Sequence, residues 1–388
     1  MTPAARLQSA IMVLDAWLSG RPLEVALTGW ARGARYAGSS DRRAVRDHVY
    51  DIVRQLGVCA HLGGGVPVQE ADGRMLVLGA LRLSGADIPA LFTGDRYAPG
   101  KLSPAEERRL ADPFEIERHR DTPAWLRPRL AAALGPDLDT FEAAMAARAP
   151  LYLRVNIQRS DRAGAAAALA KDGITALPEP GCATALRVTD GARRVTAAGA
   201  FAAGLVEPQD LSPQMACAEV PWDLGPILDY CAGGGGKSLA IAAATGQRVD
   251  VHDISPSRMA DLPSRAARAG ADLRIVAQPE PGYGTVLVDV PCSGSGTWRR
   301  DPETRWRLTE RRLAALIRSQ AAILDDASAL VRPQGRLIYM TCSVLDDENA
   351  AQTRAFLARH PRWRLGHQRL FMPPSASDGF FCATLLAP

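Results

Sequence analysis

The sequence predicts a multidomain protein with an α-helical N-terminal domain (residues 1–115), a small α+β domain (116–205) and a C-terminal α/β domain built on a largely parallel sheet (206–388). Three observations support this fold class. The length of 388 residues is enough for two or three domains. Apolar residues recur at helical spacing near the N-terminus, and strand-like and helix-like segments alternate after about residue 206.

The N-terminal domain is predicted to be helical by two periodic stretches. Apolar residues recur at Leu7, Ile11, Leu14 and Leu18, and again at Val45, Val49, Ile52 and Leu56. The second stretch follows the sequence Ser-Ser-Asp at 39–41, which is typical of a helix start. Glycines, prolines and charge clusters between residues 60 and 120 predict short helices and a linker.

The pattern changes near residue 121. The segment TPAWLRPRLAAALG predicts a helix with Pro123 in its first turn. A strand (LYLRVN), a helix (RAGAAAALAKDG) and two strands (ITALPEP and ATALRVTDG) then follow. This β-α-β-β order predicts a small ferredoxin-like domain. Such sheets often bind RNA, although Tyr152 is the one obvious strand aromatic for base stacking.

The C-terminal domain is predicted from strands that alternate with helices. The strands are PILDYC, RVDVHDI, LRIVAQ, TVLVDVP, GRLIYMTC and a last pair around WRLGHQRLF and GFFCATLL. The longest helix is expected from about Thr309 to Val331. Alternation of this kind favours a parallel sheet covered by helices on both faces.

Ligands of such sheets bind at the carboxyl ends of the strands, so those ends are the expected place for chemistry. They carry, in order along the chain, the loop Cys231–Lys237, Asp253, Gln278, the segment Asp289–Cys292, and Cys342.

The loop after the first of these strands reads LDYCAGGGGKS (228–238) and resembles a phosphate-binding loop at first sight. The nucleoside-triphosphate motif fails because Cys231 stands where its first glycine is required. The dinucleotide fingerprint fits only partly, since Gly233 and Gly235 fill two positions but Ser238 falls on the third. We interpret the loop as a βα turn whose backbone approaches a ligand, with Asp253 reaching a ribose. A turn with no ligand is the alternative.

Two cysteines stand at neighbouring strand ends, Cys292 in VDVPCSGSG and Cys342 in YMTCS. A lone cysteine is most often a small buried hydrophobe. Two of them, each in a turn rich in proline, serine, threonine and glycine, favour a chemical role. Asp289 can cap a turn, but its place beside the two thiols also favours function.

Several of these segments resemble those of a known family. VDVPCSGSGTWRRDPETRW, GRLIYMTCSVLDDEN and LDYCAGGGGKS together closely resemble the RsmB/Sun family of RNA (cytosine-5) methyltransferases. The segments QDLSPQMA (209–216) and DGFF (378–381) match it as well, and the resemblance covers roughly 121–388. The helix DRRAVRDHVYDIVR (41–54) resembles the NusB-like RNA-binding domain of the RsmB branch.

The resemblance implies a Rossmann-like methyltransferase domain with S-adenosyl-L-methionine as its cofactor. The methionine end of the cofactor would be held by the loop Cys231, Ala232, Gly233, Gly234, Gly235, Gly236 and Lys237. Asp253 would bind the ribose, and Gln278 stands where the family has an aspartate that contacts the adenine. Gly234 replaces the proline of the usual family loop.

The family pattern also implies the catalytic roles. Cys342 would attack C6 of the cytosine, and Cys292 would assist the later elimination. Asp289 would hydrogen-bond the base, and it would also contribute to the cofactor-binding site. The target base has to leave its stack before it can be attacked. We interpret Arg299 and Arg300, next to the catalytic loop, as contacts to the RNA backbone.

Composition adds bounds on location and partners. We find no run of about 18 apolar residues and no signal peptide, because Asp15 interrupts the apolar N-terminal stretch. The seven cysteines include no C-x-x-C pair, so we expect no metal site and reduced thiols in the cytoplasm. The net charge of +4 permits an RNA partner without requiring one. We expect a monomer without a membrane partner.

Three functions are compared. The leading prediction is 5-methylcytosine formation in RNA, most of all in small-subunit ribosomal RNA. The runner-up is a DNA cytosine-5 methyltransferase, which uses the cysteine of its Pro-Cys pair as nucleophile and has no counterpart of Cys342. The third is a non-catalytic RNA-binding or antitermination protein. The presence of Cys292, Cys342 and Asp289 together argues against it.

Overall fold

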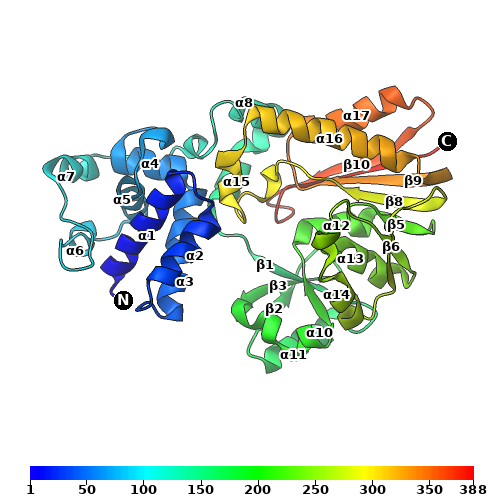
Figure 1. Ribbon diagram of the computed structural model, residues 1–388, viewed down its shortest axis with the longest axis horizontal. Coiled ribbons are helices and arrows are strands. Elements are labelled where there is room, and N and C mark those ends of the chain that lie inside the picture. The colour runs from blue at the N-terminus through cyan, green and yellow to red at the C-terminus, as the bar shows by residue number, and fades with distance from the viewer. The chain divides into compact units, whose positions relative to one another are not determined.

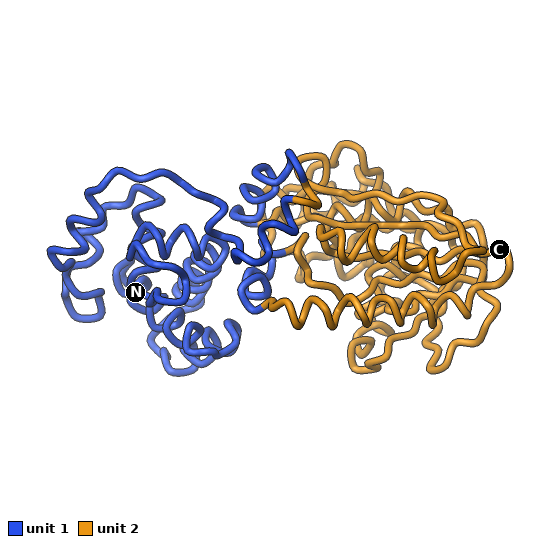
Figure 2. The backbone as a smooth tube through the Cα atoms, turned by 90° about the horizontal axis from the view of Figure 1, so that it is seen from above, with its two compact units in different colours: residues 1–131, 135–148, 298–307 blue, residues 132–134, 149–297, 308–388 orange.

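The computed structural model describes residues 1–388, which divide into two compact units (Figure 2). Unit 1 comprises residues 1–131, 135–148 and 298–307, and unit 2 comprises residues 132–134, 149–297 and 308–388. The two units divide the chain differently from the expected domains 1–115, 116–205 and 206–388. The three-domain division therefore stays a prediction.

Unit 1 is helical (Figure 1). Its helices are α1 (Pro3–Leu18), α2 (Leu23–Gly33), α3 (Ser39–Arg54), α4 (Leu56–Gly64), α5 (Gly73–Ser84), α6 (Ile88–Leu91), α7 (Pro104–Ala111), most of α8 (Arg127–Leu134), α9 (Leu138–Ala146) and α15 (Pro302–Arg307). The periodic residues expected to face the core do so: Leu14, Val45, Val49 and Leu56 are fully buried. Side chains cap four of these helices: Thr2 accepts from the Ala5 amide, Asp72 from the Met75 amide, Asp87 from the Ala90 amide and Ser103 from the Glu106 amide.

The helix expected to start near Pro123 begins later. Helix α8 starts at Arg127 and carries Pro128 in its first turn. The carbonyl of Pro123 accepts from the amides of Leu126 (2.9 Å) and Arg127 (3.2 Å), so Pro123 closes a turn before the helix. Both prolines suit a helix start, and the sequence alone favoured the wrong one.

The ten-residue segment 298–307, which follows soon after Cys292 in the chain, belongs to unit 1 rather than unit 2. The Glu303 carboxylate accepts from Trp17 Nε1 (3.0 Å) and from the Leu23 amide (3.1 Å). The buried Arg305 donates to the carbonyl of Asp121 (2.8 Å). These bonds join residues far apart in the chain, which is why sequence patterns did not assign this segment to the helical part.

The small sheet of unit 2 has the strand order β2-β3-β1-β4 and is antiparallel. Its strands are β1 (Leu151–Val155), β2 (Thr175–Pro178), β3 (Ala185–Asp190) and β4 (Val206–Pro208), with helices α10 (Arg162–Lys171) and α11 (Gly199–Ala202). The expected β-α-β-β order is confirmed. Strand β4 was not expected here: it pairs with β1, so the small sheet extends past residue 205.

The large sheet has the order β10-β11-β9-β8-β5-β6-β7. Its strands are β5 (Ile227–Asp229), β6 (Val249–Val251), β7 (Leu273–Ile275), β8 (Tyr283–Asp289), β9 (Val331–Thr341), β10 (Arg364–Phe371) and β11 (Phe380–Leu386). The first five are parallel, and β11 is antiparallel to both of its neighbours. All seven predicted strands are present, so the Rossmann-like expectation is confirmed.

Helices cover both faces of the large sheet, as expected (Figure 1). Helices α16 (Glu310–Ser328) and α17 (Ala350–Arg359) lie on one face, and α12 (Leu211–Glu219), α13 (Gly236–Thr245) and α14 (Leu262–Ala269) lie on the other. Helix α16 starts next to Thr309 as expected, and Thr309 caps it, but the helix ends at Ser328 because Val331 already begins β9. Residues 276–282 join β7 to β8 without a helix.

Candidate active site

The two strand-end thiols lie beside each other. Cys292 follows β8, Cys342 follows β9, and their Sγ atoms are 3.3 Å apart. Strands β8 and β9 are parallel neighbours, so their carboxyl ends meet at one edge of the sheet. The pairing that the sequence predicted is therefore a direct contact between two partly buried thiols.

The contact makes the two thiols unequal. The hydrogen bond from Cys292 lowers the pKa of Cys342 below its usual value, although burial opposes this shift. The same hydrogen bond, together with burial, raises the pKa of Cys292 well above its usual value. Cys342 is therefore the more acidic of the two thiols, and a thiolate is the nucleophilic form of cysteine.

A buried carboxylate, Glu348, fixes the loop that bears Cys292. It accepts from the Ser293 amide (2.8 Å), the Ser293 hydroxyl (2.5 Å) and Gln320 Nε2 (3.0 Å). The Gly296 amide donates to the carbonyl of Cys342 (2.9 Å) and so joins the two thiol-bearing loops. Hydrogen bonds of this kind hold the two thiol-bearing loops in place.

An ion pair connects the glycine loop to the end of β8. Lys237 Nζ lies 2.5 Å from Asp289 Oδ2 and stands 5.2 Å from the centre of the Phe380 ring. Burial would lower the pKa of Lys237, but the adjacent Asp289 raises it well above its usual value. Lys237 is therefore a cation within reach of Asp289, which the sequence predicted to hydrogen-bond the base.

The conformation of the loop explains two of its glycines. Gly233 and Gly235 have φ angles of +50° and +77°, a region that side chains disfavour. A Cβ atom at Gly235 would also stand 2.0 Å from Leu262. The carbonyls of the other two glycines are held from outside the loop: Arg265 donates to Gly234, and Arg154 donates to Gly236 (2.7 Å).

Two acidic groups next to the loop suit a ligand with hydroxyl and ammonium donors. Asp253 accepts from the amides of Gly233 and Ser255 (both 2.9 Å) and pairs with Arg258 at 3.2 Å. Asp229 accepts from the Ser238 hydroxyl through Oδ2, whereas its Oδ1 is buried without a hydrogen-bond partner. Burial raises the pKa of Asp229 to about 6. An orphaned carboxylate oxygen is an acceptor that a bound cation could satisfy.

Gln278 lines a pocket that does not include the glycine loop. The pocket has a volume of about 580 Å³, and it is also lined by Asp250, Arg274 and Tyr283 but by none of the residues 231–237. The adenine contact that the resemblance implies for Gln278 is therefore not supported by a contact in the structure, and it stays a prediction.

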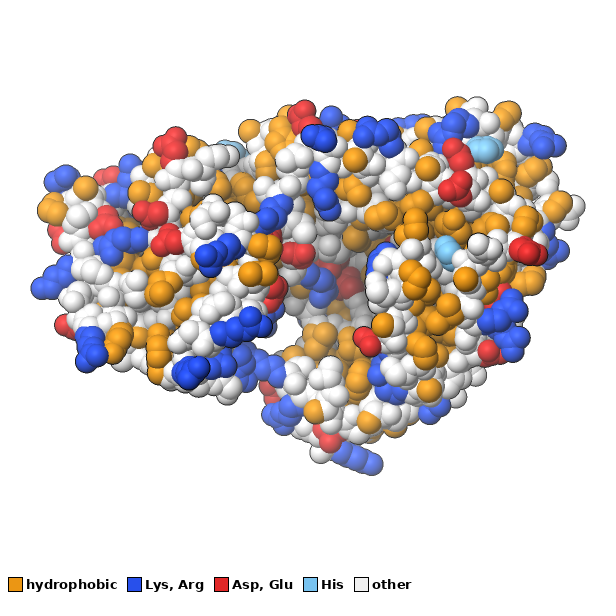
Figure 3. Space-filling view, viewed as in Figure 1, with side chains coloured by type: hydrophobic (Ala, Val, Ile, Leu, Met, Phe, Trp, Pro, Cys, Tyr) orange, Lys and Arg blue, Asp and Glu red, His pale blue; other side chains and the backbone are white.

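The two arginines expected to touch RNA differ from each other. Arg299 is buried, and its carbonyl accepts from Arg54 Nε at 2.6 Å. Arg300 is exposed and lines a cleft of unit 1 with Arg46, Arg54 and Arg148. Figure 3 shows basic side chains gathered over α3, the helix that supplies Arg46 and Arg54 to this cleft. We therefore keep only Arg300 as a candidate for RNA contact.

Several site residues were missed by the sequence reasoning. Glu348 lies in the segment GRLIYMTCSVLDDEN, but its position in that segment does not predict a contact with the Cys292 loop. Arg154 and Glu207 come from the small sheet. Glu207 pairs with Arg265 (2.8 Å), which in turn holds Gly234. No spacing rule connects residue 207 with residue 265, so this support could be found only in the folded chain.

Helix length and composition bear on the membrane. None of the helices combines the length and the apolar character needed to cross a bilayer.

Two family models match the chain. The model for the 16S rRNA methyltransferase RsmB/F matches residues 218–386, and that for the RsmF/B-like ferredoxin-like domain matches residues 122–195. Similar curated proteins include ribosomal RNA small subunit methyltransferase B of Salmonella arizonae. It is 37% identical over 286 residues, which are 68% of this chain and 66% of that protein. The protein of the same name from Klebsiella pneumoniae is 33% identical over 72% of this chain and 69% of its own length. The chain thus spans about two thirds of the length of these relatives.

Solved structures share the fold. The protein PH0851 superposes with a TM-score of 0.73 and 22% identity over 99% of both chains. NSun6 from Pyrococcus horikoshii, solved with the ligand SFG, gives a TM-score of 0.60 and 18% identity over 68% of this chain and 98% of its own. The fold, the two thiol-bearing strand ends and the similarity to named relatives agree with one another, and the chain belongs to the RsmB/F family of methyltransferases.

Proposed function

We propose that the protein transfers a methyl group from S-adenosyl-L-methionine to C5 of cytosine in RNA, through a covalent bond between Cys342 and C6 of the base. The observation that carries this proposal is the 3.3 Å contact between Cys342 and Cys292, which lowers the pKa of Cys342. The relatives named after small-subunit ribosomal RNA support that RNA as the substrate, and we propose the cytoplasm as the location.

The residues around the glycine loop fit this cofactor. The orphaned Oδ1 of Asp229 would accept from its ammonium group, and Asp253 would accept from its ribose hydroxyls once Arg258 moves aside. The backbone of residues 231–237 would lie against its methionine end. When bound, the cofactor supplies an electrophilic methyl group.

Cytosine C5 is a poor nucleophile, and the two sulfurs address this problem in turn. The Cys342 thiolate forms a bond to C6, and the electrons of the C5–C6 double bond move onto C5 and the N3–C4 side of the ring. Asp289 hydrogen-bonds that side of the base and stabilises the adduct. After C5 gains the methyl group, its proton leaves to a base, the C5–C6 double bond reforms and Cys342 departs as a thiolate. Cys292 assists this elimination.

The structure also bears on the runner-up functions. A DNA-type enzyme would use the cysteine of the Pro-Cys pair, here Cys292, as the nucleophile. The hydrogen bond from Cys292 to Cys342 opposes that assignment because it raises the pKa of Cys292. A non-catalytic RNA-binding protein would have no need for two thiols in contact.

One experiment separates the three functions. The purified chain is incubated with methyl-tritiated S-adenosyl-L-methionine and either total RNA or DNA, and the labelled nucleosides are identified. We expect labelled 5-methylcytidine from RNA alone. Label in DNA would favour the runner-up, and no label in either polymer would favour the non-catalytic alternative.

A further inference from the structure

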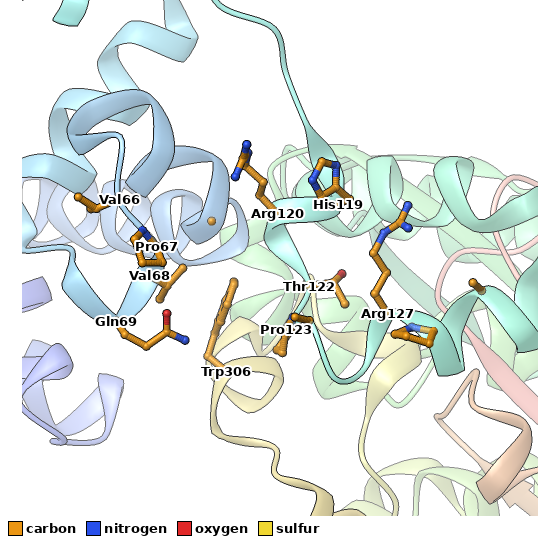
Figure 4. A pocket seen from close by; sticks show the side chains of 14 residues that line it. Val66, Pro67, Val68, Gln69, His119, Arg120, Thr122, Pro123, Arg127 and Trp306 are labelled. Carbon is orange, nitrogen blue, oxygen red and sulfur yellow. The ribbon is translucent and has the colours of Figure 1, made fainter.

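Unit 1 contains a pocket of about 480 Å³ that has no part in the site above (Figure 4). Three stretches of chain build it: Gly57 with residues 66–69, the segment 119–131, and Trp306 of α15. In the close-up, Trp306 lies between Gln69 and Pro123. The volume of the pocket is within the ordinary range for ligand sites.

The indole of Trp306 is fixed in place yet remains half-buried. Its Nε1 donates to the carbonyl of Val53 (3.3 Å), and Glu303 and Arg305 hold the same short helix against α1, α2 and residue 121. Gly57 permits a close approach of the backbone, because a Cβ atom there would stand 1.7 Å from the Arg120 carbonyl. The pocket therefore offers a rigid aromatic surface to a planar group.

The charges around the pocket favour an anion. His119, Arg120 and Arg127 line it, and no carboxylate does. Arg127 is 39% exposed, and its Nε forms an ion pair with Oε1 of the buried Glu142 at 3.4 Å. This ion pair is not a hydrogen bond, so the buried Nε has no hydrogen-bond partner. Arg120 pairs with Glu117 through Nε, and both side chains remain more than a third exposed. The pocket thus combines an aromatic surface, an exposed amide at Gln69 and three basic groups.

We infer that this pocket binds one unpaired nucleotide of the RNA substrate. The base stacks on Trp306, the amide of Gln69 meets the edge of the base, and Arg120 and Arg127 hold the adjoining phosphates. Aromatic surfaces and arginines are the groups with which proteins bind unpaired RNA. A proline-rich peptide could also use a surface lined by tryptophan and proline, but it would not need three basic groups. This inference rests on the proposed function, because it takes RNA as the substrate.

The test measures binding of a fluorescein-labelled single-stranded RNA octamer to the full chain by anisotropy, with a matched RNA duplex and cytidine monophosphate as competitors. The variants are Trp306→Leu, Trp306→Phe, Arg120→Gln and Arg127→Gln. Arg108→Gln is the matched control, since Arg108 is exposed on α7 of the same unit and does not line the pocket. Circular dichroism melting shows whether each variant folds.

We expect Trp306→Leu to weaken octamer binding by roughly 5- to 150-fold, whereas Trp306→Phe, which keeps an aromatic surface, loses much less. Each arginine variant weakens binding and reduces its salt dependence by about one phosphate contact. The unlabelled octamer competes well, the duplex competes poorly, and cytidine monophosphate competes only at high concentration. The control binds like the unaltered chain.

Equal binding by a folded Trp306→Leu variant would overturn the inference, and so would an equal loss in Arg108→Gln. Stronger displacement by cytidine monophosphate than by the octamer would reassign the pocket to a free nucleotide. If Trp306→Leu does not fold, crosslinking of a 4-thiouridine octamer decides, because attachment outside residues 66–69, 119–131 and 306 contradicts the inference. The tritium assay is read separately. Methylation of RNA with an inactive pocket rejects only this inference, and octamer binding without methylation rejects only the proposed function.

Discussion

Two sites are built in different ways. One is the strand-end edge of unit 2, formed by the glycine loop 231–237, Asp289, Cys292 and Cys342. The other is the Trp306 pocket of unit 1, lined by Gly57, residues 66–69, residues of the segment 119–131 and Trp306. At the strand ends, Cys292 and Cys342 come from short motifs that meet because β8 and β9 are parallel neighbours. The pocket is assembled from three stretches that no repeat or spacing connects. The strand-end edge pairs Lys237 with a carboxylate, whereas no carboxylate lines the pocket. Chemistry that depends on sheet topology can thus be predicted from sequence, and a binding surface made by tertiary packing cannot.

The largest expected effect distinguishes the two cysteines of the strand-end edge from each other. Cys342→Ala should abolish both the product and the covalent RNA complex, because no other thiolate can add to C6. Cys292→Ala should still attack and methylate the base and then stall, so that an adduct accumulates on a denaturing gel. The observation that would reverse the two roles is an adduct from Cys342→Ala and none from Cys292→Ala.

The next effect tests the link between the glycine loop and β8. Lys237→Met should lower kcat/KM by roughly 100-fold, because it leaves Asp289 without its cation at the place where the base is bound. Lys171→Met is the control, since Lys171 is exposed at the end of α10 in the same unit. Steady-state methylation of RNA measures both variants. A loss below threefold for Lys237→Met would show that the ion pair is dispensable.

The sequence predicted all seven strands of the large sheet, and it placed the glycine loop and the two thiols at carboxyl ends of parallel strands. It succeeded because each strand is an apolar run that ends in turn residues, and parallel strands bring those ends together. The sequence could not predict the ion pair between Lys237 and Asp289 or the hydrogen bonds from the Cys292 loop to Glu348. Such contacts depend on side-chain positions in three dimensions. The start of α8 was missed for a local reason, since Pro123 and Pro128 suit a helix start equally well.

The pKa of the Cys342 thiol supplies a third test of the strand-end edge. The pKa of Cys342 is lowered chiefly by the hydrogen bond from Cys292, so its thiolate persists to a lower pH than that of a free thiol. Alkylation of Cys342 by iodoacetamide should rise with pH through a midpoint below the usual value of about 8.5. In Cys292→Ala the donor is lost and the midpoint should move to higher pH.

Mass spectrometry of the peptide that contains Cys342 measures this midpoint without interference from the other thiols. Cys292→Ser is the matched variant, because its hydroxyl can still donate to the sulfur and should restore part of the shift. A midpoint that is the same in the unaltered chain and in Cys292→Ala would mean that the contact does not activate Cys342.

A smaller effect should stay within unit 1. Glu303→Gln replaces the charged acceptor of Trp17 Nε1 and of the Leu23 amide. We expect it to lower the free energy of unfolding of unit 1 by roughly 1.5 kcal/mol, the scale of a hydrogen bond to a charged group. Hydrogen exchange should quicken in α1 and α2, and the affinity for S-adenosyl-L-methionine should not change. Glu310→Gln, an exposed position at the start of α16, is the control. Equal hydrogen-exchange rates in α1 and α2 for both variants would show that Glu303 does not stabilise these helices.

The smallest effect concerns the strand end that least resembles its neighbours. Gln278 follows β7 in the chain but lines a separate pocket with Asp250 and Arg274. If it contacts the adenine as the resemblance implies, Gln278→Asp should tighten binding of S-adenosyl-L-methionine by about 1 kcal/mol, because a charge-assisted hydrogen bond replaces a neutral one. Calorimetry measures the affinity, and Glu280→Gln, which alters a charge in the same pocket, is the control. An unchanged or weaker affinity for Gln278→Asp would separate this strand end from the cofactor and leave four strand ends, rather than five, at the site.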